Sequence, residues 1–406
     1  MGFFKKTIRD VPLDNQTILI RVDYNVPLTD EGKIDDDLRI RASLPTLQHL
    51  LDRGCKLVLI SHLGRPEGHD LKFSLEPAAL HLGELLGRAV TFVDATIGDT
   101  AYQGVKQVPS GGVVMLQNLR FYPEEEADDQ DFAKAIAHAA QAAYFVQDGF
   151  GVVHRAHAST HAITLELPSV AGLLLEREFT TISSAMDSPK RPLVAVLGGA
   201  KVSDKIQVVE RFVELADTLL IGGAMANTFL RYKGVNVGTS KVETDQNETL
   251  DGIYKAAHEK VGEEVDNFIV LPSDAAVGTE VSNKVPRRVR KLSDVEQDEM
   301  ILDIGNESID RFCEVIEAAG TVIWNGPMGI DELPNFAHGS ARMALIMATH
   351  PEITSIIGGG DTADFVLKWD VKKGGSFTHV STGGGASLDL MAGKTLPGVA
   401  SLLDAT

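Results

Sequence analysis

The segment IIGGGDTADF, residues 356–365, joins an apolar run to three glycines and then to a pattern typical of a helix. Glycines lack Cβ atoms and let the backbone approach a ligand closely. Asp361 and Thr362 are residue types that start helices, and a helix N-terminus offers free N–H groups and a partial positive charge to a phosphate. An aspartate beside phosphates favours Mg²⁺. The segment predicts a phosphate site in an α/β fold, although an ordinary strand-to-helix turn has the same composition.

Short apolar runs alternate with longer amphipathic segments along almost the whole chain. This alternation predicts parallel sheets with helices on both faces, and it occurs in two successive sets. The 406-residue length also favours two domains of comparable size. We therefore predict an α/β protein with two doubly wound, Rossmann-like domains joined by a hinge helix at 171–186. The expected strands are 17–22, 56–60, 90–93, 113–116 and 144–147 in the first domain, and 193–197, 218–221, 268–271, 321–324, 355–357 and 377–380 in the second.

Composition excludes several classes of function. The formal net charge of -19 argues against a nucleic-acid-binding protein, because phosphate backbones require a basic surface. Two cysteines far apart in the sequence indicate a reducing compartment. The N-terminus lacks the apolar segment of a signal peptide, and no segment is long and apolar enough to span a membrane. We expect a cytoplasmic protein that binds anions through a local group of cations.

Basic and polar residues follow four of the strands expected in the first domain. Ligands of doubly wound sheets bind at the carboxyl ends of the strands. Each arginine taken alone is more typical of a surface salt bridge, but their position at successive strand ends predicts one rim that binds a small, multiply charged anion. The residues are Arg21, Arg39, Arg65, Arg120, Arg155 and His62. A metal site at His154, His157 and His161 is disfavoured, because Arg155 among them would repel a cation.

The second domain has a different set of residues at its strand ends. Gly198 and Gly199 open an expected helix with a helical pattern over 202–215. Lys201 and Lys205 are four residues apart and would share one face of that helix. Two ammonium groups beside a glycine crevice suit the phosphates of a nucleotide, although solvated surface lysines are common. The glycines at 222–223 offer a flat surface to a base, and the carboxylates at 331–332 suit ribose hydroxyls.

Two further patterns are weak. Gly393-Lys394-Thr395 resembles the end of a P-loop, but position 388 is leucine where that motif requires glycine. The glycines at 358 and 360 fit a relaxed dinucleotide-binding pattern without the acidic residue about 20 positions later that would bind the ribose.

Nine segments spread over nearly the whole chain belong together. They are RVDYNVP (21–27), SHLGRP (61–66), LQNLRFYPEEE (116–126), DGFGVVHRAHAS (148–159), GGAKVSDK (198–205), GGAMANTFL (222–230), WNGPMG (324–329), GGGDT (358–362) and STGGGASLDLMAGKTLPG (381–398). In this order they resemble the motifs of the phosphoglycerate kinase family. The resemblance implies a monomeric glycolytic and gluconeogenic enzyme that transfers a phosphoryl group between ATP and the carboxylate of 3-phosphoglycerate with Mg²⁺. It implies that 1–170 bind 3-phosphoglycerate, that 187–386 bind the ATP or ADP, and that 387–406 return to the first domain.

The resemblance also assigns roles to individual residues. Catalysis is assigned to Arg39, Lys201, Lys205 and Gly360, and metal binding to Asp361. The implied substrate-binding residues are Arg21, Asp23, Tyr24, Asn25, Arg39, His62, Leu63, Gly64, Arg65, Arg120 and Arg155. The implied nucleotide-binding residues are Gly199, Lys201, Lys205, Gly223, Asn325, Glu332, Gly359, Gly360, Asp361 and Thr362.

Four positions depart from the family pattern: Tyr24 and Asp331 replace aromatic residues, Gln117 replaces a glutamate, and Asp389 replaces a glutamate. Two other classes of protein remain as alternatives. An NAD-dependent oxidoreductase would use the glycines at 358–360. A non-catalytic anion-binding protein with two lobes would use the arginines but would have no use for Lys201, Lys205 and Asp361.

Overall fold

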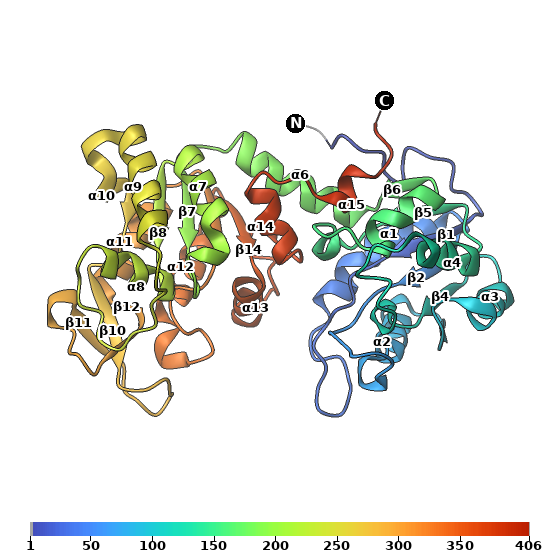
Figure 1. The fold of residues 1–406 in the computed structure, drawn as a ribbon, viewed down its shortest axis with the longest axis horizontal. Coiled ribbons are helices and arrows are strands. Elements are labelled where there is room, and N and C mark those ends of the chain that lie inside the picture. Colours follow the sequence, from blue (N-terminus) through green and yellow to red (C-terminus); the bar gives the residue numbers. More distant parts are fainter. Residues whose placement is uncertain (1–2, 406) are drawn as a thin grey trace. The chain divides into compact units, whose positions relative to one another are not determined.

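A computed structural model describes residues 3–405. Contacts divide the chain into Met1–Thr180 with Lys394–Thr406, which we call the N-terminal unit, and Thr181–Gly393, which we call the C-terminal unit. Each unit contains a six-stranded, fully parallel sheet with helices (Figure 1). The predicted α/β class with two doubly wound domains is thus confirmed. No helix in the described residues is long and apolar enough to cross a membrane.

The sheet of the N-terminal unit has the strand order β3-β4-β2-β1-β5-β6. The chain runs outward from β1 in one direction through β2 and in the other through β5, so the carboxyl ends of β1 and β5 flank the point where a ligand is expected. These ends lie close together: a Cβ on Gly149 would be 3.1 Å from the carbonyl carbon of Val22. The strands are β1 (Thr17–Arg21), β2 (Lys56–Ile60), β3 (Val90–Val93), β4 (Val113–Leu116), β5 (Tyr144–Gln147) and β6 (Ser169–Ala171).

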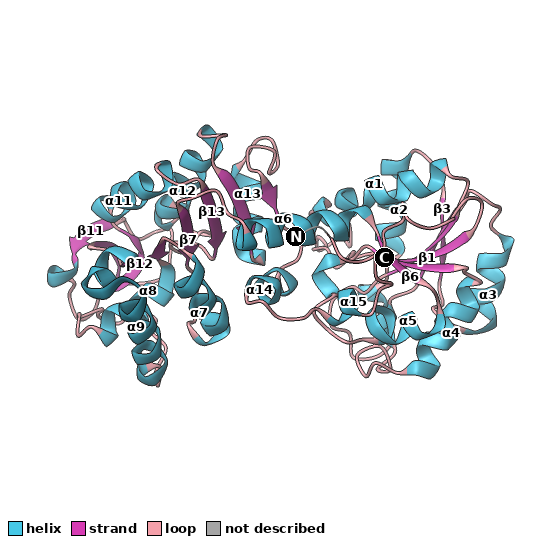
Figure 2. Ribbon diagram, turned by 90° about the horizontal axis from the view of Figure 1, so that it is seen from above, coloured by secondary structure: helices cyan, strands magenta, loops and turns pink. Residues whose placement is uncertain are grey.

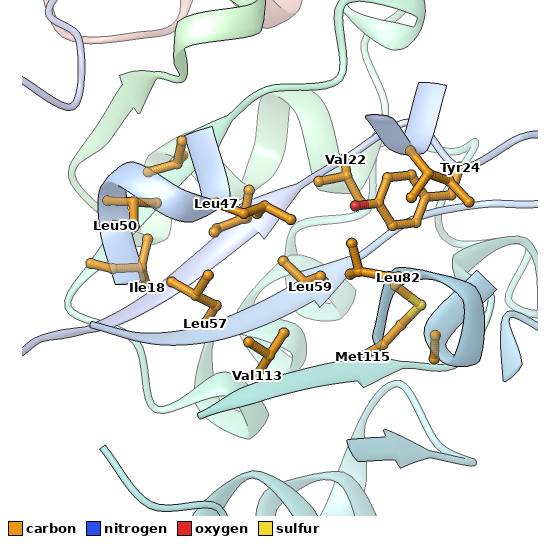
Figure 3. Packing of buried hydrophobic residues seen from close by; sticks show 14 of the residues in the cluster. Ile18, Val22, Tyr24, Leu47, Leu50, Leu57, Leu59, Leu82, Val113 and Met115 are labelled. Carbon is orange, nitrogen blue, oxygen red and sulfur yellow. The ribbon is translucent and has the colours of Figure 1, made fainter. Parts of the chain in front are cut away.

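Helices cover both faces of this sheet (Figure 2). Successive strand residues point to opposite faces, so Ile18 packs against Leu47 and Leu50 (Figure 3), while Leu19 belongs to the cluster around Phe132. Both faces are therefore apolar, which explains why the strands read as continuous apolar runs. One face is covered by α1 (Leu38–Asp52) and α2 (Glu76–Leu86), the other by α3 (Gly98–Gln107), α4 (Gln130–Ala140) and α5 (Ile163–Glu166).

The parallel sheet of the C-terminal unit has the order β15-β14-β13-β7-β8-β9. Its strand order reverses between β7 and β13, which pair in register. The strands are β7 (Leu193–Leu197), β8 (Thr218–Ile221), β9 (Ile269–Val270), β13 (Thr321–Asn325), β14 (Thr354–Gly358) and β15 (His379–Val380). The helices are α7 (Ile206–Leu215), α8 (Gly223–Tyr232), α9 (Asn247–Val261), α10 (Val265–Phe268), α11 (Asn306–Glu317), α12 (His338–Thr349), α13 (Gly360–Trp369) and α14 (Gly385–Met391).

Two features of the C-terminal unit differ from the sequence prediction. A separate antiparallel sheet, β10 (Asp274–Gly278), β11 (Arg288–Lys291) and β12 (Met300–Ile304), was not predicted. The sequence of β11 is charged and β10 is rich in alanine, so neither has a strand pattern. The predicted helix 202–215 begins only at Ile206, after a 3-10 turn at Ser203–Lys205. Lys201 and Lys205 therefore do not share a helical face, and that expectation was wrong.

The connecting helix α6 spans Leu173–Asp187, while Ser169–Ala171 form β6 instead of the start of the helix. The C-terminal segment, with α15 (Pro397–Ala400), contacts the N-terminal unit from Lys394 onward, later than the predicted position 387. The Lys6 N–H donates to the Leu403 carbonyl, which adds a backbone link between the two ends of the chain.

A buried carboxylate, Asp148, lies between α1 and the start of α6. Its Oδ1 accepts hydrogen bonds from Thr46 Oγ1 (2.8 Å) and from the Leu174 N–H (3.1 Å), while its Oδ2 is buried without a partner. Burial raises the pKa of Asp148 to about 7 from 3.8, although both hydrogen bonds oppose this shift. A carboxyl group whose pKa is higher in the folded than in the unfolded state stabilises the fold most at low pH.

We predict that Asp148→Asn weakens the pH dependence of the unfolding free energy. In the native chain, the contribution of Asp148 to the unfolding free energy is complete below pH 3.8 and decreases until the pH reaches about 7. Between these two pH values the carboxyl group has lost its proton in the unfolded state but keeps it in the folded state. Urea unfolding followed by circular dichroism at several pH values measures this slope. The exposed Asp99→Asn is the control, and an unchanged slope in Asp148→Asn would contradict the prediction.

Candidate active site

Arginines gather at the carboxyl ends of the strands in the N-terminal unit. Arg65 follows β2, Arg120 lies in the 3-10 turn after β4, and Arg155 follows β5; all three line one cavity of about 720 Å³. Burial and the neighbouring cations Arg155 and Arg65 lower the pKa of Arg120, although Glu126 opposes them at 2.9 Å. Guanidinium groups that converge in this way favour a bound anion.

Arg39 belongs to the same edge of the sheet, in the first turn of α1. Its Nη1 donates to Asp23 Oδ2 (3.0 Å) and to the Asn25 carbonyl (3.1 Å). Asn25 Oδ1 in turn accepts from the Gly64 N–H at 2.8 Å. The loops after β1 and β2 are thereby fixed to each other, with the Arg39 side chain still partly exposed.

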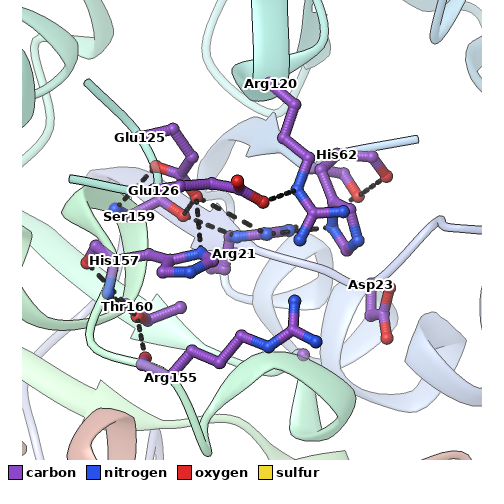
Figure 4. A network of polar contacts seen from close by, with 12 residues as sticks. Arg21, Asp23, His62, Arg120, Glu125, Glu126, Arg155, His157, Ser159 and Thr160 are labelled. Carbon is purple, nitrogen blue, oxygen red and sulfur yellow. Dashed lines mark hydrogen bonds and ion pairs between the residues drawn. The ribbon is translucent and has the colours of Figure 1, made fainter. Parts of the chain in front are cut away.

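The structure places Arg21 beneath this rim and not on it (Figure 4). Its side chain is 1% exposed, its Nε donates to Ser159 Oγ (2.8 Å), and its Nη1 donates to the Val22 carbonyl (2.6 Å). The expectation that Arg21 is part of an exposed rim is therefore corrected. Tyr24 and Leu63 are also buried, with the Tyr24 hydroxyl 2.8 Å from Ser43 Oγ, so their side chains support the site from below.

A glycine-lined crevice lies at the reversal of strand order in the C-terminal unit. The Gly198 N–H donates to the Asn325 carbonyl (2.9 Å), which joins the ends of β7 and β13. Lys205 Nζ lies in the crevice and donates to the Gly198 carbonyl (2.7 Å). Gly326 has a φ of 100°, and a Cβ there would lie 2.2 Å from the Gly198 carbonyl oxygen, so no other residue fits. Burial lowers the pKa of Lys205 to about 8, although Asp361 opposes the shift.

A cavity of about 500 Å³ adjoins this crevice. Its lining is mostly apolar with a few polar groups, as in sites for cofactors and nucleotides. Gly223, the first residue of α8, has a φ of 62°, and a Cβ there would lie 2.6 Å from the Gly199 nitrogen. The lining includes Gly199, Gly223, Leu230, Leu292, Met300, Ile301, Asp303, Asp331, Glu332 and Asp361.

The glycine segment 356–365 forms the end of β14 and the N-terminal part of α13. Thr362 Oγ1 accepts a hydrogen bond from the Gly326 N–H (2.6 Å), so Thr362 fixes the opposite loop. Asn325 is 1% exposed, and its Nδ2 is buried without a partner. A Cβ on Gly359 would lie 2.9 Å from that Nδ2. A buried, unpaired donor beside a helix N-terminus favours an anionic ligand at this place.

Sequence reasoning missed two residues that support this site. Asp303 is 2% exposed and accepts from the Gly339 N–H (3.0 Å), and burial raises its pKa to about 7. In the sequence, Asp303 could have been noticed as an aspartate within an apolar run of residues. Glu243 accepts from the Val202 N–H (2.8 Å), the Ser203 N–H (3.0 Å) and the Ser203 hydroxyl, so it fixes the loop that carries Lys201. No pattern in the sequence indicated Glu243.

The family model described as phosphoglycerate kinase matches residues 8–394. The chain belongs to the phosphoglycerate kinase family. A phosphoglycerate kinase of Chloroflexus aurantiacus is 46% identical over 407 residues, covering 99% of each chain. One of Dictyoglomus turgidum is 44% identical over 403 residues, covering 98% of this chain and 99% of the relative. The resemblance found in the sequence is therefore confirmed.

Solved structures agree with this assignment. Phosphoglycerate kinase from Coxiella burnetii superposes with a TM-score of 0.84 at 33% identity, covering 98% of both chains. The enzyme from Pyrococcus horikoshii gives a TM-score of 0.83 at 33% identity, with the same coverage. Members of the phosphoglycerate kinase family are phosphotransferases with a carboxyl acceptor, and the chain is a glycolytic kinase.

The structure explains one departure from the phosphoglycerate kinase pattern and gives the surroundings of another. Gln117 Oε1 accepts from the Leu75 N–H (3.1 Å), as a glutamate would, while its Nε2 donates to Asp94 at 2.8 Å. The glutamine thus bonds a carboxylate that a glutamate would repel. Asp331 lines the nucleotide-sized cavity beside Glu332, and burial together with the Glu332 charge raises its pKa to about 7.

Proposed function

We propose that the chain catalyses reversible, Mg²⁺-dependent transfer of the γ-phosphoryl group of ATP to the carboxylate of 3-phosphoglycerate, which yields ADP and 1,3-bisphosphoglycerate. The observation that carries the proposal is the crevice at Gly198 and Gly326, where Lys205 and the unpaired Asn325 amide face a glycine-lined helix N-terminus. Family membership narrows the anion of the arginine-lined cavity to a phosphorylated acid.

In this proposal the N-terminal unit binds 3-phosphoglycerate. Arg65, Arg120 and Arg155 bind its phosphate, because guanidinium groups match phosphate oxygens in pairs. Asp23 and Asn25 bind the hydroxyl and carboxyl end, and Arg39, which bonds to both of them, contacts the phosphoryl group during transfer. The ground for the phosphate role is the cavity that the three arginines line together. The ground for the other role is the position of Asp23 and Asn25 after β1 and their hydrogen bonds with Arg39.

In the C-terminal unit the base occupies the apolar part of the cavity and Glu332 binds the ribose. Lys205 and the backbone of Gly359 and Gly360 bind the phosphates, where α13 begins. Lys201 is exposed and interacts electrostatically with Glu243, and we assign its ammonium group to the phosphoryl group in transfer. Positive charge aimed at the developing charge is the main means of catalysis in phosphoryl transfer.

Asp361 is the proposed Mg²⁺ ligand. Within the described residues, no group of three or more His, Cys, Asp or Glu side chains suits a metal ion. Mg²⁺ in kinases is commonly held by one or two carboxylates together with substrate phosphates and water, so a single exposed carboxylate at the start of α13 fits this ion. When bound, Mg²⁺ neutralises charge on the β- and γ-phosphates.

The acceptor carboxylate is already ionised at neutral pH, so the reaction needs no general base and no protein nucleophile. The protein must supply positive charge and exclude water, since an acyl phosphate hydrolyses easily.

With one substrate assigned to each unit, transfer requires hinge closure. We expect small-angle X-ray scattering to report a smaller radius of gyration with both substrates than with either one alone. Identical curves would contradict closure.

The decisive experiment is an assay of ADP formation from ATP, Mg²⁺ and 3-phosphoglycerate, in which each component is omitted in turn. Activity that requires all three supports the proposal. Absorbance titration with NADH tests the oxidoreductase alternative, and binding of Mg-ATP argues against a non-catalytic anion-binding protein.

We also propose a cytoplasmic monomer, on the grounds of the two buried free cysteines and the family resemblance. Sedimentation measures the oligomeric state.

A further inference from the structure

Arg21 and His62 form a buried pair with a defined proton position. Arg21 Nη2 lies 3.1 Å from His62 Nδ1 (Figure 4). A guanidinium group has only N–H donors and no acceptor, so Nδ1 must accept and cannot carry a proton. An imidazole with a bare Nδ1 is neutral and has its proton on Nε2. Within residues 3–405 that Nε2–H makes no hydrogen bond, so it is left for a ligand.

We propose that Arg21 is a positioning residue that locks His62 in the neutral Nε2–H tautomer, so that His62 gives the anionic substrate an uncharged hydrogen-bond donor. The part concerning the substrate rests on the function proposed above, but the tautomer does not. Arg21 was expected from the sequence to contact the substrate directly. Its buried position instead makes it act through His62.

The surroundings of His62 favour the neutral ring. His62 is 4% exposed, and burial lowers its pKa well below 6.5. The groups of neighbouring elements that also lower the pKa of His62 are Arg21 at the end of β1, Arg120 after β4, Arg39 on α1 and His157 after β5. Each of these cations disfavours a second positive charge on the ring, so protonation would break the Arg21 bond and add repulsion.

A second buried network holds Arg21 in the required orientation. Ser159 Oγ accepts from Arg21 Nε and donates to Glu125 Oε1 at 2.6 Å. Glu125 is 0% exposed, lies 3.9 Å from Arg21 Nη2, and also accepts from the Ser159 N–H (Figure 4). The buried guanidinium therefore has a counter-charge and a fixed plane. With Nε and Nη1 both bonded, the position of Nη2 at His62 is determined.

The test is ¹⁵N NMR of the histidine side chains in the full chain without substrate. Histidine ring nitrogens with and without a proton have well separated shifts, and the signals missing from His62→Ala identify His62. We expect a bare Nδ1 and a protonated Nε2 throughout the range from about pH 5.5 to about pH 8, with no titration near the ordinary value of about 6.5. An Nδ1–H tautomer, or titration near that value, would overturn the proposal.

A charge-balanced variant, Arg21→Met with Glu125→Gln, tests whether Arg21 is the cause of the single His62 tautomer. It removes the donor without leaving Glu125 as an uncompensated buried charge. We expect mixed tautomers of His62 and a KM for 3-phosphoglycerate raised about tenfold, with kcat less affected. A folded variant that retains the single Nε2–H tautomer would show that Arg21 is not the cause; if it does not fold, the spectra of the native chain still decide the tautomer.

A failure of the proposed function can be distinguished from a failure of the tautomer lock. Absence of phosphoryl transfer in the assay would refute the proposed function and leave the NMR result unaffected. A titrating His62 in a fully active enzyme would refute the tautomer lock alone. Arg177→Met, which removes an arginine on α6 outside this network, is the matched control and should leave the His62 signals unchanged.

Discussion

Replacing Lys201 by alanine is expected to lower kcat by roughly 100- to 1000-fold, the usual loss when one group that stabilises the charge of the transition state is removed. Lys201 is exposed and its loop is fixed through Val202 and Ser203 by Glu243, so the backbone should remain in place after the substitution. The affinity for ADP should change less than about fivefold, because Lys205 and the glycine segment still bind the phosphates.

Steady-state assays at saturating substrates and calorimetric titration with ADP separate the two quantities. Lys255→Ala, which removes an exposed lysine on α9 outside the cavity lining, is the control and should be active. A large loss of ADP affinity with kcat preserved would mean that Lys201 binds nucleotide in the ground state.

Glu243→Ala offers a related comparison, since it keeps Lys201 but removes the side chain that fixes the Lys201 loop. We expect a smaller loss of kcat than in Lys201→Ala.

The fold could be predicted, and the loops of the candidate sites could be selected, because both depend on periodic, local signals. Apolar runs that alternate with amphipathic segments specify parallel sheets, and the rule that ligands bind at strand ends then selects the loops after β1, β2, β4, β5, β7 and β13. The three-stranded antiparallel sheet had no such signal. Its middle strand, Asp274–Gly278, is short and consists mostly of small residues, and three of the four residues of Arg288–Lys291 are charged.

The depth of a charged side chain was the part that sequence could not specify. Arg21 is the last residue of a strand with both faces covered, so it is buried, yet it has the same residue type as the arginines of the rim. Its partner Glu125 lies in the run Pro123-Glu124-Glu125-Glu126, which reads as a solvated acidic segment. Only the tertiary fold shows that one of these glutamates is 0% exposed. Long-range pairs of this kind have no local pattern.

Replacing Arg39 by alanine is expected to lower kcat/KM for 3-phosphoglycerate by roughly 1000-fold, through both kcat and KM. Arg39 donates to Asp23 and to the Asn25 carbonyl, so its loss removes a cation from the substrate and also removes the ion pair of the Asp23 carboxylate. That carboxylate would repel an anionic substrate. Because Asp23 is itself assigned to the substrate hydroxyl, the double variant Arg39→Ala with Asp23→Asn is compared with Asp23→Asn alone. Both variants lack the carboxylate, so the difference between them reports the missing cation.

Arg41→Ala is the matched control, because Arg41 lies on the same helix, is exposed and, among residues 3–405, forms its ion pair with Asp37 one turn away. Exposed pairs of this type contribute less than about 1 kcal/mol to stability, so activity should remain near that of the native chain.

Arg39→Lys keeps the positive charge and loses the planar guanidinium group that can form paired hydrogen bonds. If Arg39 contacts the phosphoryl group through paired hydrogen bonds, Arg39→Lys should resemble Arg39→Ala in kcat. If only its charge matters, Arg39→Lys should retain most of the rate, and an active Arg39→Ala would refute the assignment of Arg39 altogether.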